Sequence, residues 1–301
     1  MCNNRTNQQN PVNKGIAALV QFFMPQGDPE NKIKMKGSDK QMCKIYAIAS
    51  MKGGVTKTTT SLNLATALGL TGKKVLMVDL DPQGSLSICA GVENPDKLTH
   101  TTYSLLNAAL NEEELPEPRE YIIPCEKIDI IPCNIKLSAF ELNRGHEIGA
   151  EKALQTVIEP LKELYDVIII DTPPSLGILT ANALTASGGV IIPVTPQLLS
   201  AVGMKMLIKT IQKIQKHVNP TVTIEGVLMS MCDTRTNLYK EISEIMEKTY
   251  SQTVRIFDTI IPHSTKVGEA NLRQQSVLIY DENSKPSLAY KKFAEELMAN
   301  G

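Results

Sequence analysis

Apolar and polar positions follow a regular rhythm from residue 44 to the end of the chain. Short apolar blocks, each predicted to be a β-strand, cover residues 44–50, 73–81, 128–133, 166–174, 188–196 and 223–233. Apolar residues at helical spacing predict α-helices over residues 56–72, 148–165, 201–218 and 287–299. The run VIII before Asp171 has no polar residue, which is typical of a strand covered on both faces. Strands that alternate with helices predict an α/β fold with a mostly parallel β-sheet and helices on both faces.

The first 43 residues do not share this rhythm. They are rich in Asn, Gln, Lys and Pro, and we expect residues 1–43 to form an N-terminal arm, partly disordered or docked on a dimer. One folded domain is expected over residues 44–301. The apolar run of the arm, residues 16–24 (IAALVQFFM), has a leader with little positive charge and no small-residue cleavage site after it. We interpret it as a short docked helix and not as a signal peptide or membrane anchor.

Composition narrows the class of protein. The chain has 301 residues, 42% of them hydrophobic and 21% charged, with a formal net charge of −1. These values are typical of a soluble globular protein. A net charge so close to zero gives no overall electrostatic attraction to nucleic acid, so any DNA binding has to come from a local basic patch. The six cysteines form no C-x-x-C pair, which indicates free thiols in the cytoplasm. No apolar run is long enough to cross a bilayer.

A glycine loop, residues 49–61 (ASMKGGVTKTTTS), follows the first predicted strand and leads into the first predicted helix. Backbone N–H groups at such a helix N-terminus favour phosphate oxygens. Gly53 and Gly54 allow the backbone to approach a ligand closely. Lys57 is placed to reach phosphates and the hydroxyl of Thr58 to ligate Mg²⁺. The loop therefore predicts a P-loop NTPase-like fold.

The loop nevertheless departs from the usual pattern G-x-x-x-x-G-K-[ST]. Met51 and Thr56 stand at its two glycine positions, and only Lys57 and Thr58 match. The loop alone leaves open whether the site is functional, degenerate or a coincidence of small residues.

Three acidic residues at predicted strand ends support a nucleotide site. Asp79 and Asp81 follow the second strand, and Asp171 ends the strand VIIID. Ligands of parallel α/β sheets bind beyond the carboxyl ends of the strands. One acid of the first pair is placed to support Mg²⁺ through water and the other to orient an attacking water, while Asp171 suits a Mg²⁺-supporting role. A single acid at such a position is often only a cap, but three acids together with Lys57 and Thr58 predict ATP and Mg²⁺ as ligands.

Several motifs carry a family resemblance. KGGVTKTT, VDLDPQGS and IIIDTPPSLGILTANAL occur in this order and resemble the deviant Walker A ATPases of the ParA/Soj partition family. The loop of that family reads x-K-G-G-x-x-K-[ST], which requires Lys52 and leaves the positions of Met51 and Thr56 open. IPCNIKLSAFEL, PVTPQLLSAVGMKML, MSMCDTRTNL and IPHSTKVGEA resemble later family segments, so the resemblance runs from Lys44 to the C-terminus. The segments from Val190 onward look most like partition ATPases of plasmids and conjugative elements of Gram-positive bacteria.

The resemblance implies a role for each matching residue. Lys52 would be the signature lysine that reaches across a nucleotide-sandwich dimer to the phosphates of the partner subunit. Lys57 would hold phosphates within the subunit, Thr58 would ligate Mg²⁺, Asp81 would position the hydrolytic water and Asp171 would be the Walker B acid. The catalytic candidates are Lys52, Lys57 and Asp81; the metal candidates are Thr58, Asp79 and Asp171; the nucleotide-binding candidates are Lys52, Gly53, Gly54, Val55, Thr56, Lys57, Thr58, Thr59, Pro262 and Ser264.

Two positions depart from the family. Pro262 matches a residue near the adenine, but His263 and Ser264 follow it where the family often has Arg-Asn. Thr56 stands where the family usually has glycine. A positive φ at a β-branched residue would cost on the order of 1–2 kcal/mol, so we predict that Thr56 adopts a negative φ.

A basic helix face is the candidate DNA surface. Lys205, Lys209, Lys213 and Lys216 lie at spacings of four, four and three in the helix predicted over residues 201–218, opposite an apolar stripe of Leu207, Ile211, Ile214 and Val218. By itself this pattern favours a solvated face. The resemblance favours DNA, because partition dimers bind it through basic residues of this region. Weaker candidates are Arg235, Lys240 and Arg273, of which Arg235 has a structural alternative near the nucleotide.

The leading hypothesis is a DNA partition ATPase with slow, Mg²⁺-dependent hydrolysis. The resemblance implies a cytoplasmic, nucleoid-associated homodimer that binds non-specific double-stranded DNA and is reset by a ParB-like centromere-binding protein.

Three other classes of protein fit the sequence less well. A MinD-like membrane-cycling ATPase would need a membrane-binding C-terminal helix, yet residues 287–299 carry Glu295 and Glu296 and are expected to dock on the core. An iron protein would need a cluster-ligating cysteine soon after Asp171, and DTPPSLG has none. A non-enzymatic DNA regulator would need an N-terminal helix-turn-helix domain, for which 43 residues are too few.

Overall fold

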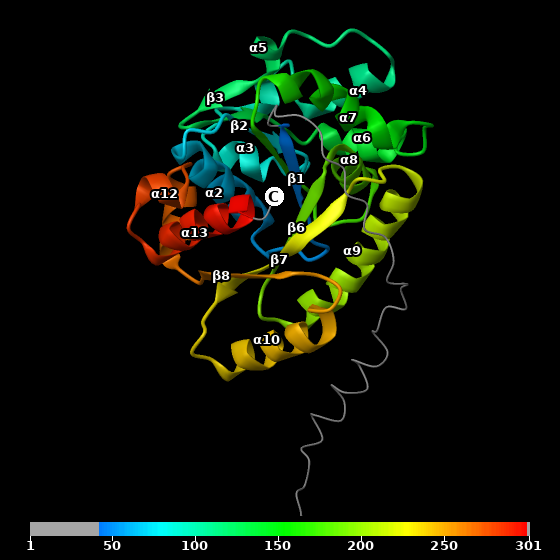
Figure 1. Ribbon diagram of the computed structural model, residues 1–301. Coiled ribbons are helices and arrows are strands. Elements are labelled where there is room, and N and C mark those ends of the chain that lie inside the picture. Colours follow the sequence, from blue (N-terminus) through cyan, green and yellow to red (C-terminus); the bar gives the residue numbers. More distant parts are fainter. Residues whose placement is uncertain (1–41, 300–301) are drawn as a thin grey trace, which may run out of the picture.

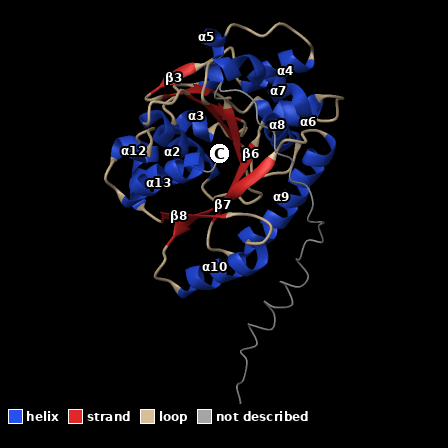
Figure 2. Ribbon diagram, in the orientation of Figure 1, coloured by secondary structure: helices blue, strands red, loops and turns tan. Residues whose placement is uncertain are grey.

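The computed structural model describes residues 42–299, with only the backbone described for residues 198–202. The predictions for the N-terminal arm, including the apolar run at residues 16–24, lie outside the described residues. The remainder forms an eight-stranded sheet between two layers of helices, and Figure 2 shows the sheet passing through the molecule with helices on both sides.

The sheet confirms the predicted mostly parallel architecture. Its strands are β1 (Lys44–Ile48), β2 (Val75–Asp79), β3 (Ile123–Cys125), β4 (Ile128–Ile131), β5 (Val167–Asp171), β6 (Gly189–Val194), β7 (Thr223–Cys232) and β8 (Ile256–Pro262). They lie in the order β3-β4-β2-β5-β1-β6-β7-β8, and only the β3–β4 pair is antiparallel. The two strands that the apolar pattern did not predict, β3 and β8, are the two edges of the sheet.

Helices cover both faces of this sheet. The α-helices are α2 (Lys57–Leu70), α3 (Ser85–Cys89), α4 (Thr102–Leu110), α5 (Pro118–Tyr121), α6 (Leu137–Arg144), α7 (Ala153–Ile158), α8 (Ile178–Ala186), α9 (Leu198–His217), α10 (Asn237–Tyr250), α11 (Thr265–Leu272), α12 (Val277–Tyr280) and α13 (Lys285–Ala299). Three short 3₁₀ segments, η1 (Pro95–Lys97), η2 (Ala150–Lys152) and η3 (Glu159–Glu163), complete the described part. Helices α2, α12 and α13 gather on one side of the sheet, and α4, α6, α7, α8 and α9 lie on the other (Figure 1).

Side chains of the central strands alternate between the two cores, as the pleat of a strand requires. In β1, Tyr46 and Ile48 join the core beneath α2 and α13, whereas Ile45 and Ala47 join the core beneath α4, α7 and α8. A third cluster packs α9 and α10 against β6 and β7. Because both faces are buried, the central strands read as continuous apolar runs.

The single helix predicted over residues 148–165 is wrong in its continuity. The segment divides into η2, α7 and η3. Pro160 lies within η3 and has no backbone N–H to donate to the preceding turn. The apolar pattern nevertheless found the correct buried residues, since Leu154, Val157 and Leu161 are all fully covered.

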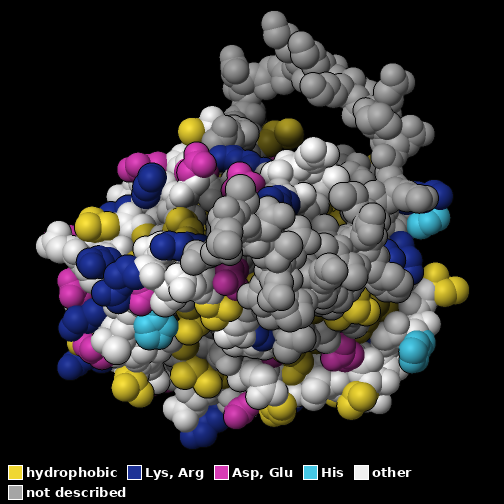
Figure 3. All heavy atoms as spheres, turned by 90° about the horizontal axis from the view of Figure 1, so that it is seen from below, with side chains coloured by type: hydrophobic (Ala, Val, Ile, Leu, Met, Phe, Trp, Pro, Cys, Tyr) yellow, Lys and Arg dark blue, Asp and Glu magenta, His cyan; other side chains and the backbone are white. Residues whose placement is uncertain are grey.

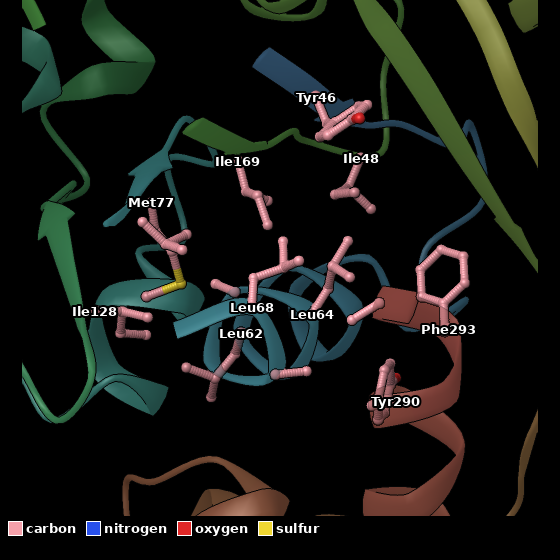
Figure 4. Packing of buried hydrophobic residues seen from close by; sticks show 14 of the residues in the cluster. Tyr46, Ile48, Leu62, Leu64, Leu68, Met77, Ile128, Ile169, Tyr290 and Phe293 are labelled. Atoms are coloured by element: carbon pink, nitrogen blue, oxygen red, sulfur yellow. The ribbon is translucent and has the colours of Figure 1, made fainter. Parts of the chain in front are cut away.

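The last helix, α13, docks on the core as predicted. Its Tyr290 and Phe293 are fully buried in the same core as the apolar face of α2, where Phe293 lies on the side of Leu64 (Figure 4). Glu296 accepts hydrogen bonds from the guanidinium of Arg255 and from the backbone N–H groups of Asp258 and Thr259, which fastens the helix to β8. Among residues 42–299, no helix has the length and apolar character needed to cross a membrane.

Truncation of the α13 anchor is predicted to destabilise the fold. Phe293 also packs edge-on against Phe257, with ring centroids 4.9 Å apart. We expect Phe293→Ala to lower the free energy of unfolding by about 3–5 kcal/mol because it leaves a cavity in the core. Urea denaturation checks this, with the exposed neighbour Lys292→Ala expected to stay within about 0.5 kcal/mol of the parent. Equal unfolding midpoints for the two variants would contradict the prediction.

Candidate nucleotide-binding site

Three parallel strands bring the predicted site residues to one edge of the sheet. The register pairs Ile48 of β1 and Asp79 of β2 with Asp171 of β5, so the three strands end level. The loop at residues 49–56 leaves β1 at this edge and α2 begins immediately after it. The sheet therefore brings together the glycine loop and the two acid clusters, which lie far apart in the sequence.

The loop has the backbone shape of an anion cradle. Gly54 has φ 74° and Thr56 has φ 68°, both in the left-handed region. Such turns direct backbone N–H groups into one concavity. A Cβ added to Gly53 or Gly54 would meet nothing within 4 Å, so open space lies in front of the loop. The loop can therefore accept a phosphate chain against its backbone.

The prediction that Thr56 has a negative φ is wrong. Thr56 caps the N-terminus of α2 with φ 68° and ψ 23°, and its carbonyl accepts the first helical hydrogen bond from Thr60 N at 2.7 Å. The cradle and the helix start impose this conformation. The hydroxyl of its side chain lies 2.5 Å from the Val55 carbonyl oxygen and 2.7 Å from Ser230 Oγ.

Lys57 is buried beneath the loop. Its side chain lies in the first turn of α2 with 7% of the residue exposed, and its Nζ donates to the Lys52 carbonyl at 3.5 Å. Desolvation lowers the pKa of this amine, while the charges of Asp171 and Asp81 act in the opposite direction. An amine that has lost water and has few partners is well suited to bind an anion entering the loop.

Two α2 hydroxyls hold the Asp171 carboxylate. Thr58 Oγ1 donates to Asp171 Oδ2 at 2.7 Å, and Ser61 Oγ donates to Asp171 Oδ1 at 3.0 Å. Asp171 is fully buried, and desolvation followed by the charge of Asp79 raises its pKa to about 7. The carboxylate is thereby oriented toward Thr58, the residue predicted to ligate Mg²⁺.

Asp79 and Asp81 occupy different environments. Asp79 is fully buried, and its carboxylate accepts hydrogen bonds from Ser87 N at 2.8 Å, from Ser87 Oγ at 2.7 Å and from Asp81 N at 3.2 Å. Burial raises its pKa to about 6. Asp81 lies in the loop beyond β2, where its carboxylate accepts from Gln83 N at 3.0 Å. Asp79 thus shapes the loop that carries Asp81.

Lys52 contacts its own subunit. Its Nζ donates to Oε1 of Gln197, the residue that caps the N-terminus of α9. The loop and the start of α9 therefore lie next to each other, and a Cβ added to Gly203 would come within 3.4 Å of Met51.

Comparisons with known proteins identify the family of the chain. A family model described as an AAA domain matches residues 43–224. The chain is 39% identical over 260 residues to the sporulation initiation inhibitor protein Soj of Bacillus subtilis, covering 86% of this chain and 100% of Soj. It is 33% identical over 264 residues to the chromosome partitioning protein ParA of Caulobacter vibrioides, covering 85% of this chain and 94% of that protein. The chain belongs to the ParA/Soj family of partition ATPases.

A solved structure shows the same fold. Cobyrinic acid a,c-diamide synthase of Mycobacterium smegmatis, with bound ADP and magnesium, matches with a TM-score of 0.73 and 32% identity, covering 86% of this chain and 95% of that one. This likeness, together with the mostly parallel sheet covered by helices on both faces, confirms the predicted P-loop NTPase-like α/β fold.

The remaining residues that were predicted to bind nucleotide lie in the loop or at the same end of the sheet. Pro262 ends β8, which is parallel to β7, β6 and β1, so its carboxyl end faces the same edge as the loop. The Ser264 hydroxyl caps α11 by accepting from Lys266 N at 3.2 Å. In the loop, Val55 is buried, and the Thr59 carbonyl accepts from Asn63 Nδ2 at 2.7 Å. An adenine role for Pro262 and Ser264 stays a prediction.

The candidate DNA residues fall into two groups. Helix α9 has two faces, with Leu207 and Ile211 buried and Lys209, Lys213 and Lys216 exposed. The prediction is confirmed only in part, because Lys205, Ile214 and Val218 are half-buried and Val218 follows the end of the helix. Lys240 is exposed on α10, which packs in the same cluster as α9.

Arg235 and Arg273 are engaged within the chain. Arg235 forms two hydrogen bonds of 2.9 Å with the Asp233 carboxylate, and they lower the pKa of Asp233 to about 2. Arg273 lies over the Tyr280 ring at 5.4 Å, on the α11–α12 side of the sheet and away from α9. Viewed from below Figure 1, Lys and Arg side chains are interspersed with acidic and apolar ones (Figure 3).

Sequence reasoning missed four residues that touch the site. Ser61, Ser87, Gln197 and Ser230 hydrogen-bond Asp171, Asp79, Lys52 and Thr56, respectively. Ser61 carried a usable signal, because it lies three residues after Thr58 and therefore on the same face of α2. Gln197 and Ser230 carried none, since their partners are 145 and 174 residues away in the sequence.

Removal of the buried loop amine is predicted to weaken nucleotide binding. We expect Lys57→Met to lower the affinity for ADP by roughly 10- to 100-fold, the range of a hydrogen bond to a charged group. Isothermal titration calorimetry with Mg²⁺ present measures this, with the exposed Lys97→Met as a control of equal charge change. Unchanged affinity in the Lys57 variant would contradict the assignment of the loop.

Proposed function

We propose that this ParA/Soj-family chain binds ATP and Mg²⁺ at the glycine loop and cycles between a DNA-bound dimer and a released form. The observation that carries the proposal is the 2.7 Å hydrogen bond between Thr58 Oγ1 and the buried Asp171 carboxylate, directly behind the open cradle of Gly53 and Gly54. The ADP and magnesium of the mycobacterial structure support these two ligands.

The donor set suits Mg²⁺, which prefers oxygen ligands and retains several waters. Thr58 would hold the ion directly, and Asp171 would hold it through water, which requires the present Thr58–Asp171 hydrogen bond to rearrange. When bound, Mg²⁺ supplies neutralisation of the charge that develops on the transferred phosphoryl group. Asp79 would act indirectly, because Ser87 and Asp81 already hydrogen-bond its carboxylate.

The hydrolytic step needs a positioned water. Asp81 lies at the same sheet edge as Lys57 and Asp171, in a loop held by the hydrogen bond from its own N–H to Asp79. Its carboxylate would accept a hydrogen bond from the attacking water, while Lys57 would stabilise negative charge on the phosphates. The expected intrinsic rate of hydrolysis is slow.

Lys52 would couple ATP to dimerisation. Its family role is to reach the phosphates of a partner subunit, and exchange of the Gln197 amide oxygen for a phosphate would strengthen its hydrogen bond through charge. A dimer that shares its active sites in this way would bind ATP more tightly than the monomer does. Such a difference in affinity between two states is the condition for a switch.

Non-specific DNA and a ParB-like protein would be the partners of the two states. The exposed lysines of α9 support DNA binding, since lysine contacts phosphate as a point charge without reading the base sequence. A centromere-binding partner would then stimulate hydrolysis and release the dimer.

A MinD-like membrane cycle is the alternative. It requires a C-terminal helix that is free to enter a lipid surface. Helix α13 buries Tyr290, Phe293 and Leu297 in the core and is tied to β8 by Glu296, which favours the DNA cycle.

Two substitutions test the switch. We expect Asp81→Ala to hold DNA with ATP for longer than the parent, because ATP binding is retained and hydrolysis is lost. Lys52→Ala is expected to remain monomeric with ATP and to lose DNA binding at least about tenfold. Gel-shift on non-specific DNA with ATP, with ADP and without nucleotide reports binding, and light scattering reports dimerisation. An Asp81 variant that neither dimerises with ATP nor holds DNA would refute the proposal.

Charge reversal tests the α9 surface. We expect Lys209→Glu with Lys213→Glu to abolish DNA binding while the ATP-dependent dimer persists. For the parent, four lysines per subunit predict a slope of about −4 to −7 in a plot of log affinity against log salt. Reversal of two exposed lysines away from α9, Lys97→Glu with Lys292→Glu, is the matched control. Intact DNA binding by the α9 variant would move the DNA surface elsewhere.

A further inference from the structure

A group of buried hydroxyls connects the phosphate loop to two distant elements. Thr56 of the loop lies 2.7 Å from Ser230 Oγ of β7. The Tyr290 hydroxyl of α13 lies 3.5 Å from Thr60 Oγ1. Burial raises the pKa of Tyr290 to about 12, and the hydroxyls of Thr60 and Ser230 act in the opposite direction. Ser230, Tyr290 and Thr60 are all fully buried. The group therefore begins at the loop and returns to the first turn of α2.

The position of Thr56 in this group is unusual for its backbone. Its φ of 68° lies in the left-handed region, which glycine adopts freely and β-branched residues avoid. Residues in such conformations persist only where surrounding structure holds them. The neighbouring Gly54, at φ 74°, needs no such support. Thr56 is thus the loop position at which the cradle is strained.

We propose that Ser230 and Thr56 are positioning residues, and that their hydrogen bond holds residue 56 in the strained conformation that the phosphate cradle requires. The bond replaces the conformational freedom that glycine would supply at this position. The inference rests on the proposed function, because it assigns the bond to nucleotide binding.

Loss of the Thr56–Ser230 hydrogen bond would lower the fraction of molecules in which the loop has the conformation that binds nucleotide. Without the bond, Thr56 relaxes from its left-handed conformation in part of the molecules. The apparent dissociation constant then rises by the inverse of the competent fraction. Once nucleotide is bound the chemistry is unaltered, so the maximal rate of hydrolysis should change less than KM.

The hydroxyl and the β-branch of Thr56 are separable by substitution. Thr56→Val keeps the strain and removes the hydroxyl, Thr56→Ser keeps the hydroxyl, and Thr56→Gly removes the strain together with the need for an anchor. Ser230→Ala removes the anchor from the other side. The Ser230→Ala change is therefore made both in the parent chain and in combination with Thr56→Gly.

Equilibrium titration of the full chain with a fluorescent ADP analogue and Mg²⁺ measures the effect. We expect Ser230→Ala and Thr56→Val each to raise the dissociation constant about five- to tenfold, with Thr56→Ser and Thr56→Gly both at least about threefold tighter than Thr56→Val. When Thr56→Gly is already present, adding Ser230→Ala should change affinity by less than about twofold. Steady-state hydrolysis should show the same rise in KM with kcat within about twofold.

A matched substitution separates positioning from stability. Ser287 of α13 is also fully buried, and it donates to the Val277 and Asp281 carbonyls. Ser287→Ala should lower the unfolding midpoint without changing ADP affinity. Equal affinity of Ser230→Ala and the parent, or an equal loss from Ser230→Ala with and without Thr56→Gly, would overturn the inference. A parent chain that binds no ADP would instead overturn the proposed function.

Discussion

The buried carboxylate of Asp171 is the constraint around which the site is arranged. It ends the central strand β5, level with Ile48 of β1 and Asp79 of β2. Each of its two oxygens accepts a hydrogen bond from a hydroxyl group in the first turns of α2. A buried carboxylate is costly unless it is hydrogen-bonded. The hydrogen bonds from Thr58 and Ser61 therefore set the rotation of α2 over the sheet, and with it the direction of the loop that precedes the helix.

The same arrangement explains why the loop tolerates strain. Helix α2 is held from below by Asp171 and from the side by α13, whose Tyr290 and Phe293 pack against it. The loop has to join β1 to this fixed helix within a few residues, and left-handed turns at Gly54 and Thr56 accomplish the connection. The hydrogen bond between Thr56 and Ser230 adds β7 to the support. The conformation of the loop therefore depends on contacts with β5, α2, α13 and β7, and not on the loop sequence alone.

The surfaces that a partition ATPase needs lie on elements adjoining this site. Gln197, the hydrogen-bond partner of Lys52, immediately precedes helix α9, and the helix carries Lys209, Lys213 and Lys216 away from the loop along one exposed face. In the proposed dimer, a change at Lys52 would therefore have a short physical path to the candidate DNA surface. Arg273 lies on the opposite layer, and its stacking on Tyr280 suits a structural role.

By itself, the sequence determined the central sheet, the buried faces of the helices and the set of residues at the strand ends. These follow from short-range rules, because the period of apolar residues reflects burial and parallel strands end at a common edge. It did not reveal the edge strands β3 and β8, which bury one face less fully, or the break at Pro160. Only the tertiary structure decided the conformation of Thr56 and the hydrogen bonds to Gln197 and Ser230. Those contacts join residues more than 140 positions apart, and no local propensity encodes an interaction in which the compensating group comes from another strand.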